Sequence, residues 1–185
     1  MDKIFKKFIK QYINALNNDI DIQLLLKSAD LIQQTRDKGG KIILAGNGGS
    51  AAMASHVAVD FTKNASIRAI NFNEADLITC FANDYGYENW VEQALKFYAD
   101  ENDLVILISS SGNSENIIRA AQYAKEQNAT IVGFSGMKSN NRLRSFCDFD
   151  FWVDNMSYNI IENIHSIWLT IICDLIIGSR EYSVE

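Results

Sequence analysis

The sequence predicts an α/β fold: a doubly wound sandwich in which one parallel sheet of five strands is covered by helices on both faces. Two observations lead to this fold class. Short apolar stretches alternate with amphipathic helical patterns along the 185 residues, which is typical of a parallel sheet with crossover helices. The stretch Leu104-Val105-Ile106-Leu107-Ile108 is apolar without interruption, as expected for a strand that is buried on both faces.

Two helices are expected at the start of the chain. Apolar residues at helical spacing predict helices over 3–17 and 21–38, and Gly39-Gly40 is a typical signal for the end of the second helix. We expect residues 1–40 to form an N-terminal helical hairpin that takes part in oligomerisation. Residues 41–185 then form the α/β core and a C-terminal interface helix.

The remaining elements alternate along the chain. Runs rich in Ile, Val and Leu predict strands, and the amphipathic stretches between and after them predict helices. The strands are expected at 41–45, 67–71, 104–109, 130–135 and 150–154, and the helices at 50–62, 75–83, 88–99, 114–127 and 158–178. The sequence contains no Gly/Ser-rich or charge-rich linker, so we expect residues 1–185 to form a single domain.

A glycine-rich turn follows the first predicted strand. Asn47, Gly48, Gly49 and Ser50 lead into helix 50–62, and free backbone N–H groups at a helix N-terminus favour an anion. The turn lacks the Gly-Lys-Ser/Thr sequence of P-loops and a full dinucleotide fingerprint, so no nucleotide cofactor is expected. Taken alone, the turn is equally compatible with a purely structural role.

A serine-rich turn follows the third predicted strand. Ser109, Ser110, Ser111 and Ser114 stand between strand 104–109 and helix 114–127. Phosphate requires several donors around its oxygens, and four hydroxyls beside backbone N–H groups supply them. Both turns fall at the carboxyl ends of strands, where open α/β sheets bind ligands. The two turns therefore predict a polar, phosphorylated ligand.

The charge balance limits the possible partners. The net charge of −6 and the isoelectric point near 4.9 argue against nucleic acid, which requires a basic face. Residues 1–8 mix charged and apolar residues at helical spacing, which favours neither a signal peptide nor a membrane span. We expect a cytoplasmic protein that contacts no membrane.

The last predicted helix is apolar on more than one face. Its apolar residues are Ile160, Ile161, Ile164, Ile167, Trp168, Leu169, Ile171, Ile172, Leu175, Ile176 and Ile177. A monomer of this size has little interior in which to bury such a helix. We expect it to pack, with the N-terminal helices, against a second copy of the chain; a central core helix is the alternative.

Together these residues resemble a known family, the sugar isomerase (SIS) domain, and within it the phosphoheptose isomerases, which act on sedoheptulose 7-phosphate. The resemblance covers nearly the whole chain. It rests on Gly46-Asn47-Gly48-Gly49-Ser50-Ala51-Ala52, on His56 followed one turn later by Asp60, on Asn83-Asp84-Tyr85-Gly86 and on Ser109-Ser110-Ser111-Gly112-Asn113-Ser114. It implies a homotetramer with active sites at subunit interfaces, and substrate contacts from Asn83 and Asp84. We expect Asn47, Ser50, Asn83 and Asp84 to orient the sugar hydroxyls.

Two pairs of side chains are candidates for the chemistry. Interconversion of a ketose phosphate and an aldose phosphate moves a proton between neighbouring carbons by way of an enediol. This reaction requires a base and a group that stabilises charge on oxygen. His56 and Asp60 are four residues apart, and Glu162 and His165 are three apart, so each pair shares a helix face. We expect Asp60, Glu162 and His165 to be catalytic, and His56, Asp60, Glu162 and His165 to bind Zn²⁺. Paired hydrogen bonds at a subunit contact are the alternative.

The chain departs from the family pattern at the catalytic positions. Phosphoheptose isomerases carry Glu at the position of Asp60, Gln at that of Glu162 and a later His at that of Thr170. Threonine cannot act as a general base near neutral pH. His165 is about 140° around the helix from Thr170, so it cannot take the missing place without a shift of the helix.

Two functions therefore remain open from the sequence. The first is an aldose–ketose isomerase acting on a sugar phosphate, such as sedoheptulose 7-phosphate, for heptose or related nucleotide-sugar synthesis in lipopolysaccharide or capsule. The second is a non-catalytic sugar-phosphate-binding protein with a regulatory or protein-interaction role. The polar residues retained at Asp60, Glu162 and the serine turn favour the enzyme.

Overall fold

Five parallel strands form one sheet in the order β2-β1-β3-β4-β5 in the computed structural model, which describes residues 2–18 and 20–178. The fold class and the five-stranded parallel sheet are as predicted. The strands are β1 (Ile42–Gly46), β2 (Ala69–Asn71), β3 (Leu104–Ser109), β4 (Thr130–Gly136) and β5 (Phe149–Val153).

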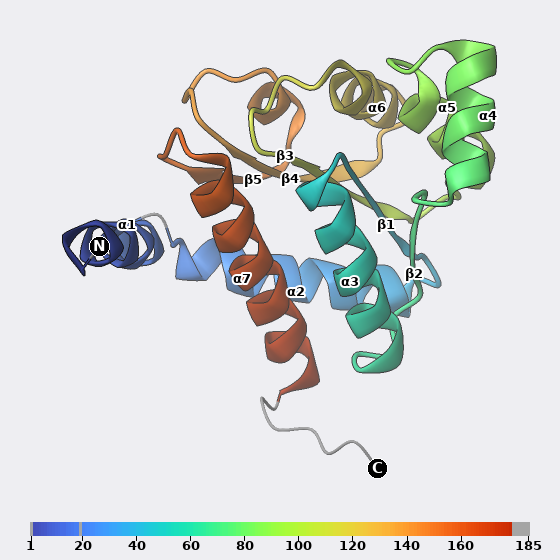
Figure 1. Cartoon of the computed structure of the whole chain (residues 1–185). Coiled ribbons are helices and arrows are strands. Elements are labelled where there is room, and N and C mark those ends of the chain that lie inside the picture. The colour runs from blue at the N-terminus through green and yellow to red at the C-terminus, as the bar shows by residue number, and fades with distance from the viewer. Residues whose placement is uncertain (1, 19, 179–185) are drawn as a thin grey trace.

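Helices cover both faces of the sheet (Figure 1). The groups α2, α3 and α7 on one face and α5 and α6 on the other follow from the two separate hydrophobic clusters. The helices are α1 (Asp2–Asn18), α2 (Ile22–Asp37), α3 (Gly49–Lys63), α4 (Ala75–Tyr85), α5 (Trp90–Tyr98), α6 (Glu115–Glu126) and α7 (Tyr158–Ile177). Each predicted helix is present with bounds shifted by at most two residues, and a short 3₁₀ helix, η1 (Leu143–Phe146), was not predicted.

The site lies where the strand order reverses. β1 pairs with β2 on one side and with β3 on the other, and Gly46 is in register with Ile108. α3 follows β1 onto one face, whereas α6 follows β3 onto the other. In such folds a crevice opens between the two diverging connections and binds the ligand. The glycine turn and the serine turn are the two walls of this position.

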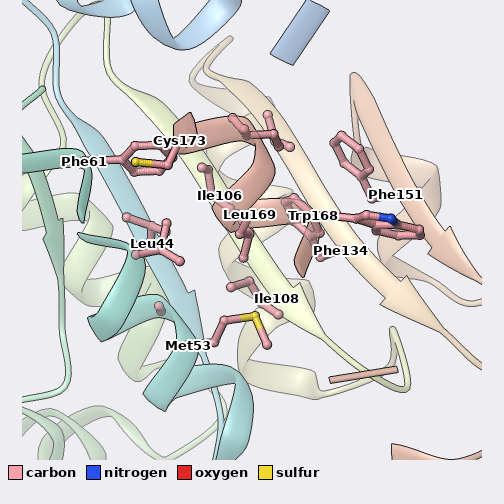
Figure 2. Packing of buried hydrophobic residues seen from close by; sticks show 14 of the residues in the cluster. Leu44, Met53, Phe61, Ile106, Ile108, Phe134, Phe151, Trp168, Leu169 and Cys173 are labelled. Atoms are coloured by element: carbon pink, nitrogen blue, oxygen red, sulfur yellow. The ribbon is translucent and has the colours of Figure 1, made fainter. Parts of the chain in front are cut away.

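Alternate residues of the central strands point to opposite layers of the core. Leu44, Ile106 and Ile108 pack against α3 and α7, while Ile43 and Leu107 pack against α5 and α6. Figure 2 shows the first layer, with Leu169 near Ile106 and Ile108 of β3 and Trp168 beside the rings of β4 and β5. An uninterrupted apolar strand is thus buried on both faces, as predicted.

α7 is mainly a core helix of its own chain. Eight of its residues are buried, and it packs against the sheet, α2 and α3. It is long and apolar enough to cross a membrane by length and composition, and 44% of its apolar window is buried inside the chain. The buried residues of α7 therefore belong to the core of their own chain, and the packing of its other apolar residues against a second copy stays a prediction.

Helix α1 exposes an apolar surface. This helix contacts α7, where Asn163 Nδ2 donates a 3.2 Å hydrogen bond to the Tyr12 hydroxyl. Much of its other apolar surface is exposed, in the side chains of Ile4, Phe5, Phe8, Ile9 and Ile13. Exposed apolar patches of this kind mark contacts with other molecules.

We expect Leu169→Ala to lower the free energy of unfolding by about 2–5 kcal/mol, because it leaves a cavity beneath the sheet. Leu175, six residues further along α7 and on another face of the helix, is 40% exposed. Leu175→Ala is the matched control and should cost less than about 1 kcal/mol. Urea denaturation at a fixed protein concentration measures both values; equal losses would contradict the core role of this face of α7.

Candidate active site

The glycine turn joins β1 to α3 in a conformation that suits glycine. Gly48 has φ 55° and ψ −121°, a backbone region in which other residues are strained. Ser50 N donates to Asn47 O at 3.0 Å, and Ala52 N donates to Gly48 O at 3.1 Å. The N–H groups of Gly48 and Gly49 precede these first helical bonds, so they supply the anion-binding end of α3. Ser50, expected to contact the sugar, is 3% exposed and lies against Gly46.

The amide of Asn47 is held by two other side chains. Asn47 and Asn116 exchange hydrogen bonds of 2.9 Å in both directions, and the Tyr87 hydroxyl donates to Asn47 Oδ1 at 3.0 Å. Both lone pairs of Asn47 Oδ1 are therefore engaged. The Asn47 side chain thus has a role within the turn, and its expected contact with sugar hydroxyls stays a prediction.

The serine turn gathers hydroxyls at the start of α6. Ser109 Oγ donates to Ser114 Oγ at 3.2 Å, and Ser111 Oγ accepts the N–H of Asn113 at 3.2 Å. The Ser110 hydroxyl is buried without a hydrogen-bond partner. The N–H of Gly112 donates to Ser109 O at 2.8 Å, so this N–H group is engaged within the turn.

The segment after β4 holds the serine turn in place. A side chain at Gly112, which has φ 63°, would overlap the Asn141 amide. Asn141 is buried, and its Nδ2 donates to Ser135 Oγ and to the carbonyls of Gly136 and Lys138. Leu143 N donates to Gly112 O at 2.9 Å. These contacts fix the turn before a ligand binds, which lowers the ordering cost of binding.

The charge of Glu115 beside the serine turn is balanced by arginine. Arg142 Nη1 donates to Glu115 Oε2 at 2.6 Å, and Arg119 approaches Oε1 at 3.4 Å. The hydrogen bond from Arg142 is the main cause that lowers the pKa of the Glu115 carboxyl. Arginine thus offsets the nearest carboxylate at an end of α6 that favours anions.

Glu162 lies directly over the glycine turn. A Cβ atom at Gly49 would be 2.6 Å from Glu162 Oε2 and 2.8 Å from its carboxyl carbon, closer than non-bonded atoms approach. The carboxylate on α7 therefore occupies space that only glycine leaves free at the start of α3. Of the predicted catalytic side chains, Glu162 is the one placed at this turn.

His56 and Asp60 form a separate pair further along α3. Their Nε2 and Oδ2 atoms are 3.3 Å apart, and the imidazole is 64% exposed. Burial and, next, the charge of Asp60 raise the pKa of the Cys173 thiol to about 12. Asp60 therefore lies near Cys173. Asp60 is 11 residues after Gly49, and Cys173 is likewise 11 residues after Glu162. Helices α3 and α7 therefore run side by side in the same direction, and the His56–Asp60 pair lies about 16 Å along α3 from the level of Glu162.

His165 is in the core and not at the site. Its side chain is fully buried, and Nε2 donates to Ser135 O of β4 at 2.9 Å. Its ring packs edge-on against Phe134. Burial, opposed by the hydrogen bond to Ser135, lowers its pKa from 6.5 to about 4. The prediction that His165 is catalytic and binds metal is wrong, because the sheet covers this side of α7.

The four predicted zinc ligands do not converge. His56 and Asp60 are adjacent, Glu162 is three turns away at the glycine turn, and His165 is bonded to the sheet. Throughout residues 2–18 and 20–178, no three His, Cys, Asp or Glu side chains are grouped so that they could hold a metal ion. These residues do not fit the expected zinc site. Thr170 also contributes no ligand here, since its hydroxyl donates to Ser166 O and Ile167 O.

Asn83 and Asp84 lie on the exposed surface of α4. Asn83 Nδ2 donates to Asp84 Oδ1 at 2.8 Å, and the Cys80 thiol is 3.7 Å from Asp84 Oδ2. The chain reaches the glycine turn two residues beyond α4, through Tyr87. Tyr87, which was not predicted, therefore contacts the glycine turn, and the expected substrate contacts of Asn83 and Asp84 stay a prediction.

Two donor-rich turns at the switch point of a parallel α/β sheet define a protein that binds a small anionic ligand. Residues 5–136 match the family described as SIS domain. The phosphoheptose isomerase of Fusobacterium nucleatum is 35% identical over 153 residues, 80% of this chain and 78% of the relative. That of Helicobacter pylori strain ATCC 700392 is 31% identical over 184 residues, 95% of each chain.

The solved structure of the phosphoheptose isomerase GmhA from Neisseria gonorrhoeae superposes with a TM-score of 0.85. It is 26% identical, and the match covers 95% of this chain and 96% of that one. This chain therefore belongs to the SIS domain family, among the phosphoheptose isomerases. The resemblance that the sequence indicated is confirmed.

The burial of His165 predicts a loss of stability in acid. Its folded pKa of about 4 lies below the ordinary 6.5, so the unfolded chain binds a proton first as the pH falls. The contribution of neutral His165 to the free energy of unfolding is fully present above pH 6.5. It is lost between pH 6.5 and 4, at up to about 1.4 kcal/mol per pH unit. Between pH 7 and 5, wild type should lose about 2 kcal/mol more than His165→Gln in urea denaturation. Equal losses would show that His165 titrates in contact with water.

Proposed function

We propose that this protein is an aldose–ketose isomerase acting on a sugar phosphate, with sedoheptulose 7-phosphate as the substrate. Its product would supply heptose for nucleotide-activated sugars of lipopolysaccharide or capsule. The observation that carries the proposal is the Glu162 carboxylate over the glycine turn, one strand away from the serine turn. A base thus faces one wall of a crevice whose other wall is built from phosphate donors.

The serine turn would bind the phosphate. Ser109, Ser111 and Ser114 have hydroxyls grouped at the N-terminus of α6, and the buried Ser110 hydroxyl adds a donor without another partner. Hydrogen bonds to a charged phosphate contribute about 1.5–3 kcal/mol each. Binding the phosphate here leaves the carbonyl end of the sugar to extend toward the glycine turn.

Glu162 would transfer the proton. The carboxylate removes a proton from C1 of the ketose, and the electrons move through an enediol as the C2 oxygen gains a proton. Glu162 then returns a proton to C2 while the C1 hydroxyl loses one, so atoms and electrons balance without a redox partner. The N–H groups of Gly48 and Gly49 at the positive end of α3 would stabilise charge that develops on the oxygens. No step here depends on a metal ion.

Asp60 is the second candidate base. It is too far along α3 to reach the sugar bound by its own chain, but it lies half-buried beside an exposed imidazole. Active sites at subunit interfaces, which the family resemblance implies, would allow the His56–Asp60 pair to complete the site of a neighbouring copy. Asp60 is therefore tested together with Glu162.

We expect Glu162→Gln to abolish the exchange of the carbon-bound proton of sedoheptulose 7-phosphate with D₂O, because the amide keeps the shape but not the basicity. Binding of inorganic phosphate, measured by calorimetry, should change by less than about twofold. Nuclear magnetic resonance of the sugar follows the exchange, with Asp60→Asn measured in parallel. Wild-type exchange in Glu162→Gln but not in Asp60→Asn would assign the base to Asp60.

A non-catalytic binding protein is the second candidate function. Two observations favour it: Thr170 donates to its own helix, and His165 is bonded to the sheet. Neither residue can therefore take the role of the histidine that the family carries late in the chain. Binding of sedoheptulose 7-phosphate without proton exchange in the wild type would support this function over the isomerase.

The exposed face of α1 supports a homo-oligomer, and we propose a cytoplasmic tetramer. Phe5 and Phe8 are 63% and 55% exposed on one side of this helix. A tetramer can bury such a face in a contact between copies, since symmetric assemblies use one self-complementary surface repeatedly.

The combined change Phe5→Asp and Phe8→Asp should shift the protein to smaller species, because it places charge in an apolar contact. Light scattering after size-exclusion chromatography measures the mass. Lys6→Asp with Lys10→Asp, on the same exposed helix, is the control and should keep the wild-type mass. A monomeric wild type at low micromolar concentration would contradict the proposed assembly.

A further inference from the structure

We infer that Asn116 and Tyr87 are positioning residues that hold the glycine turn at a fixed distance from the serine turn, and so set which sugar-phosphate length is turned over. The inference rests on the proposed isomerase function. Neither residue belongs to the glycine turn or to the serines of the second turn. The contact of Asn116 runs between the two turns, and that of Tyr87 holds the glycine turn from the segment after α4.

The central contact is a reciprocal amide pair. Asn47 Nδ2 donates to Asn116 Oδ1 and Asn116 Nδ2 donates to Asn47 Oδ1, each at 2.9 Å. Asn116 is only 3% exposed, so water cannot readily replace the pair, and leaving either amide alone would cost an unsatisfied buried group. The Tyr87 hydroxyl adds a third hydrogen bond at 3.0 Å from the segment after α4.

These contacts connect the phosphate end of the site to the proposed base. Asn116 lies in the first turn of α6, two residues after Ser114. On the other side, the Asn47 carbonyl accepts the N–H of Ser50, and Gly49 lies against Glu162. A shift of the serine turn would thus be passed through Asn116 and Asn47 to the position where the base meets the sugar.

The spacing between the turns determines which substrate carbons reach Glu162. With the phosphate held at the serine turn, only a ketose with a given number of carbons between phosphate and carbonyl places C1 and C2 at the carboxylate. A misplacement of about 1 Å can cost about 100-fold in rate. A rigid pair between the turns therefore selects by chain length during turnover, rather than by initial phosphate affinity.

The test compares Asn116→Ala and Tyr87→Phe with wild type on C5, C6 and C7 ketose phosphates. We expect Asn116→Ala to lower kcat for the preferred ketose by about 10- to 100-fold, with inorganic phosphate affinity within about twofold of wild type. Preference among the three chain lengths should flatten. Tyr87→Phe, which removes a single hydroxyl, should lower kcat by about fivefold. Gln122→Ala removes an exposed amide from the same helix and should leave all values unchanged.

Asn116→Asp adds a readout that general destabilisation would not give. An ionised Asp turns an oxygen toward Asn47 Oδ1 and repels it, whereas the protonated acid donates as the amide does. The activity of this variant relative to wild type should therefore rise as the pH is lowered.

Two results would overturn the inference. One is a parallel loss of phosphate affinity and kcat in Asn116→Ala, which would place its effect at the serine turn. The other is an unchanged length preference in both Asn116→Ala and Tyr87→Phe. If Asn116→Ala does not fold, the kcat and length preference of Tyr87→Phe decide the matter alone.

A wild type without isomerase activity would refute the proposed function but not the spacing. In that case calorimetric affinities for the three ketose phosphates, each divided by the affinity for inorganic phosphate, replace kcat. Retention of the length preference in these ratios by both variants would then overturn the spacing role, and its loss would support it.

Discussion

Parallel pairing of β1 with β3 is the constraint on which the rest of the site depends. Because Gly46 and Ile108 are in register, the backbone leaves the sheet at the same level in both strands and enters α3 and α6 on opposite faces. Two helix N-termini are thereby directed at one crevice without any special sequence outside the turns. A register shift of one residue would reverse the faces of β1 and separate the two walls.

The packing of α7 against α3 decides what reaches that crevice. The two helices run side by side, so each residue of α7 has a fixed level along α3. Glu162 falls at the level of the glycine turn, whereas Cys173 falls at the level of Asp60. The apolar face of α7 is bound to the sheet by Trp168, Leu169 and their neighbours (Figure 2), which prevents the helix from rotating to present another residue.

Local patterns predicted the elements well because their causes are local. Strand 104–109 was placed with its observed bounds, since a short, continuous apolar run between polar turns strongly favours a buried strand. Strand 67–71 was too long by two residues, because Ile67 and Arg68 precede the first pair of the ladder. The 3₁₀ helix η1 lacks a periodic pattern and is fixed by tertiary contacts such as Leu143 N to Gly112 O.

The candidate site was predictable in its turns but not in its side-chain partners. Helical spacing correctly made Glu162 and His165 neighbours, yet it could not tell that the sheet would cover one of them and leave the other at the turn. The pair Asn47–Asn116 joins residues 69 positions apart, a relation that a single sequence does not encode in any local pattern. Such contacts follow from topology and become visible only once the strands are placed.

The contact between Gly49 and Glu162 couples two positions that are distant in the chain. A Cβ atom at residue 49 would lie 2.6 Å from Glu162 Oε2, so a side chain there would have to displace the carboxylate. An alanine in the turn would therefore move the proposed base away from the position that it holds over the turn. The glycine thus serves the proposed chemistry through the side chain that it lacks as well as through its N–H group.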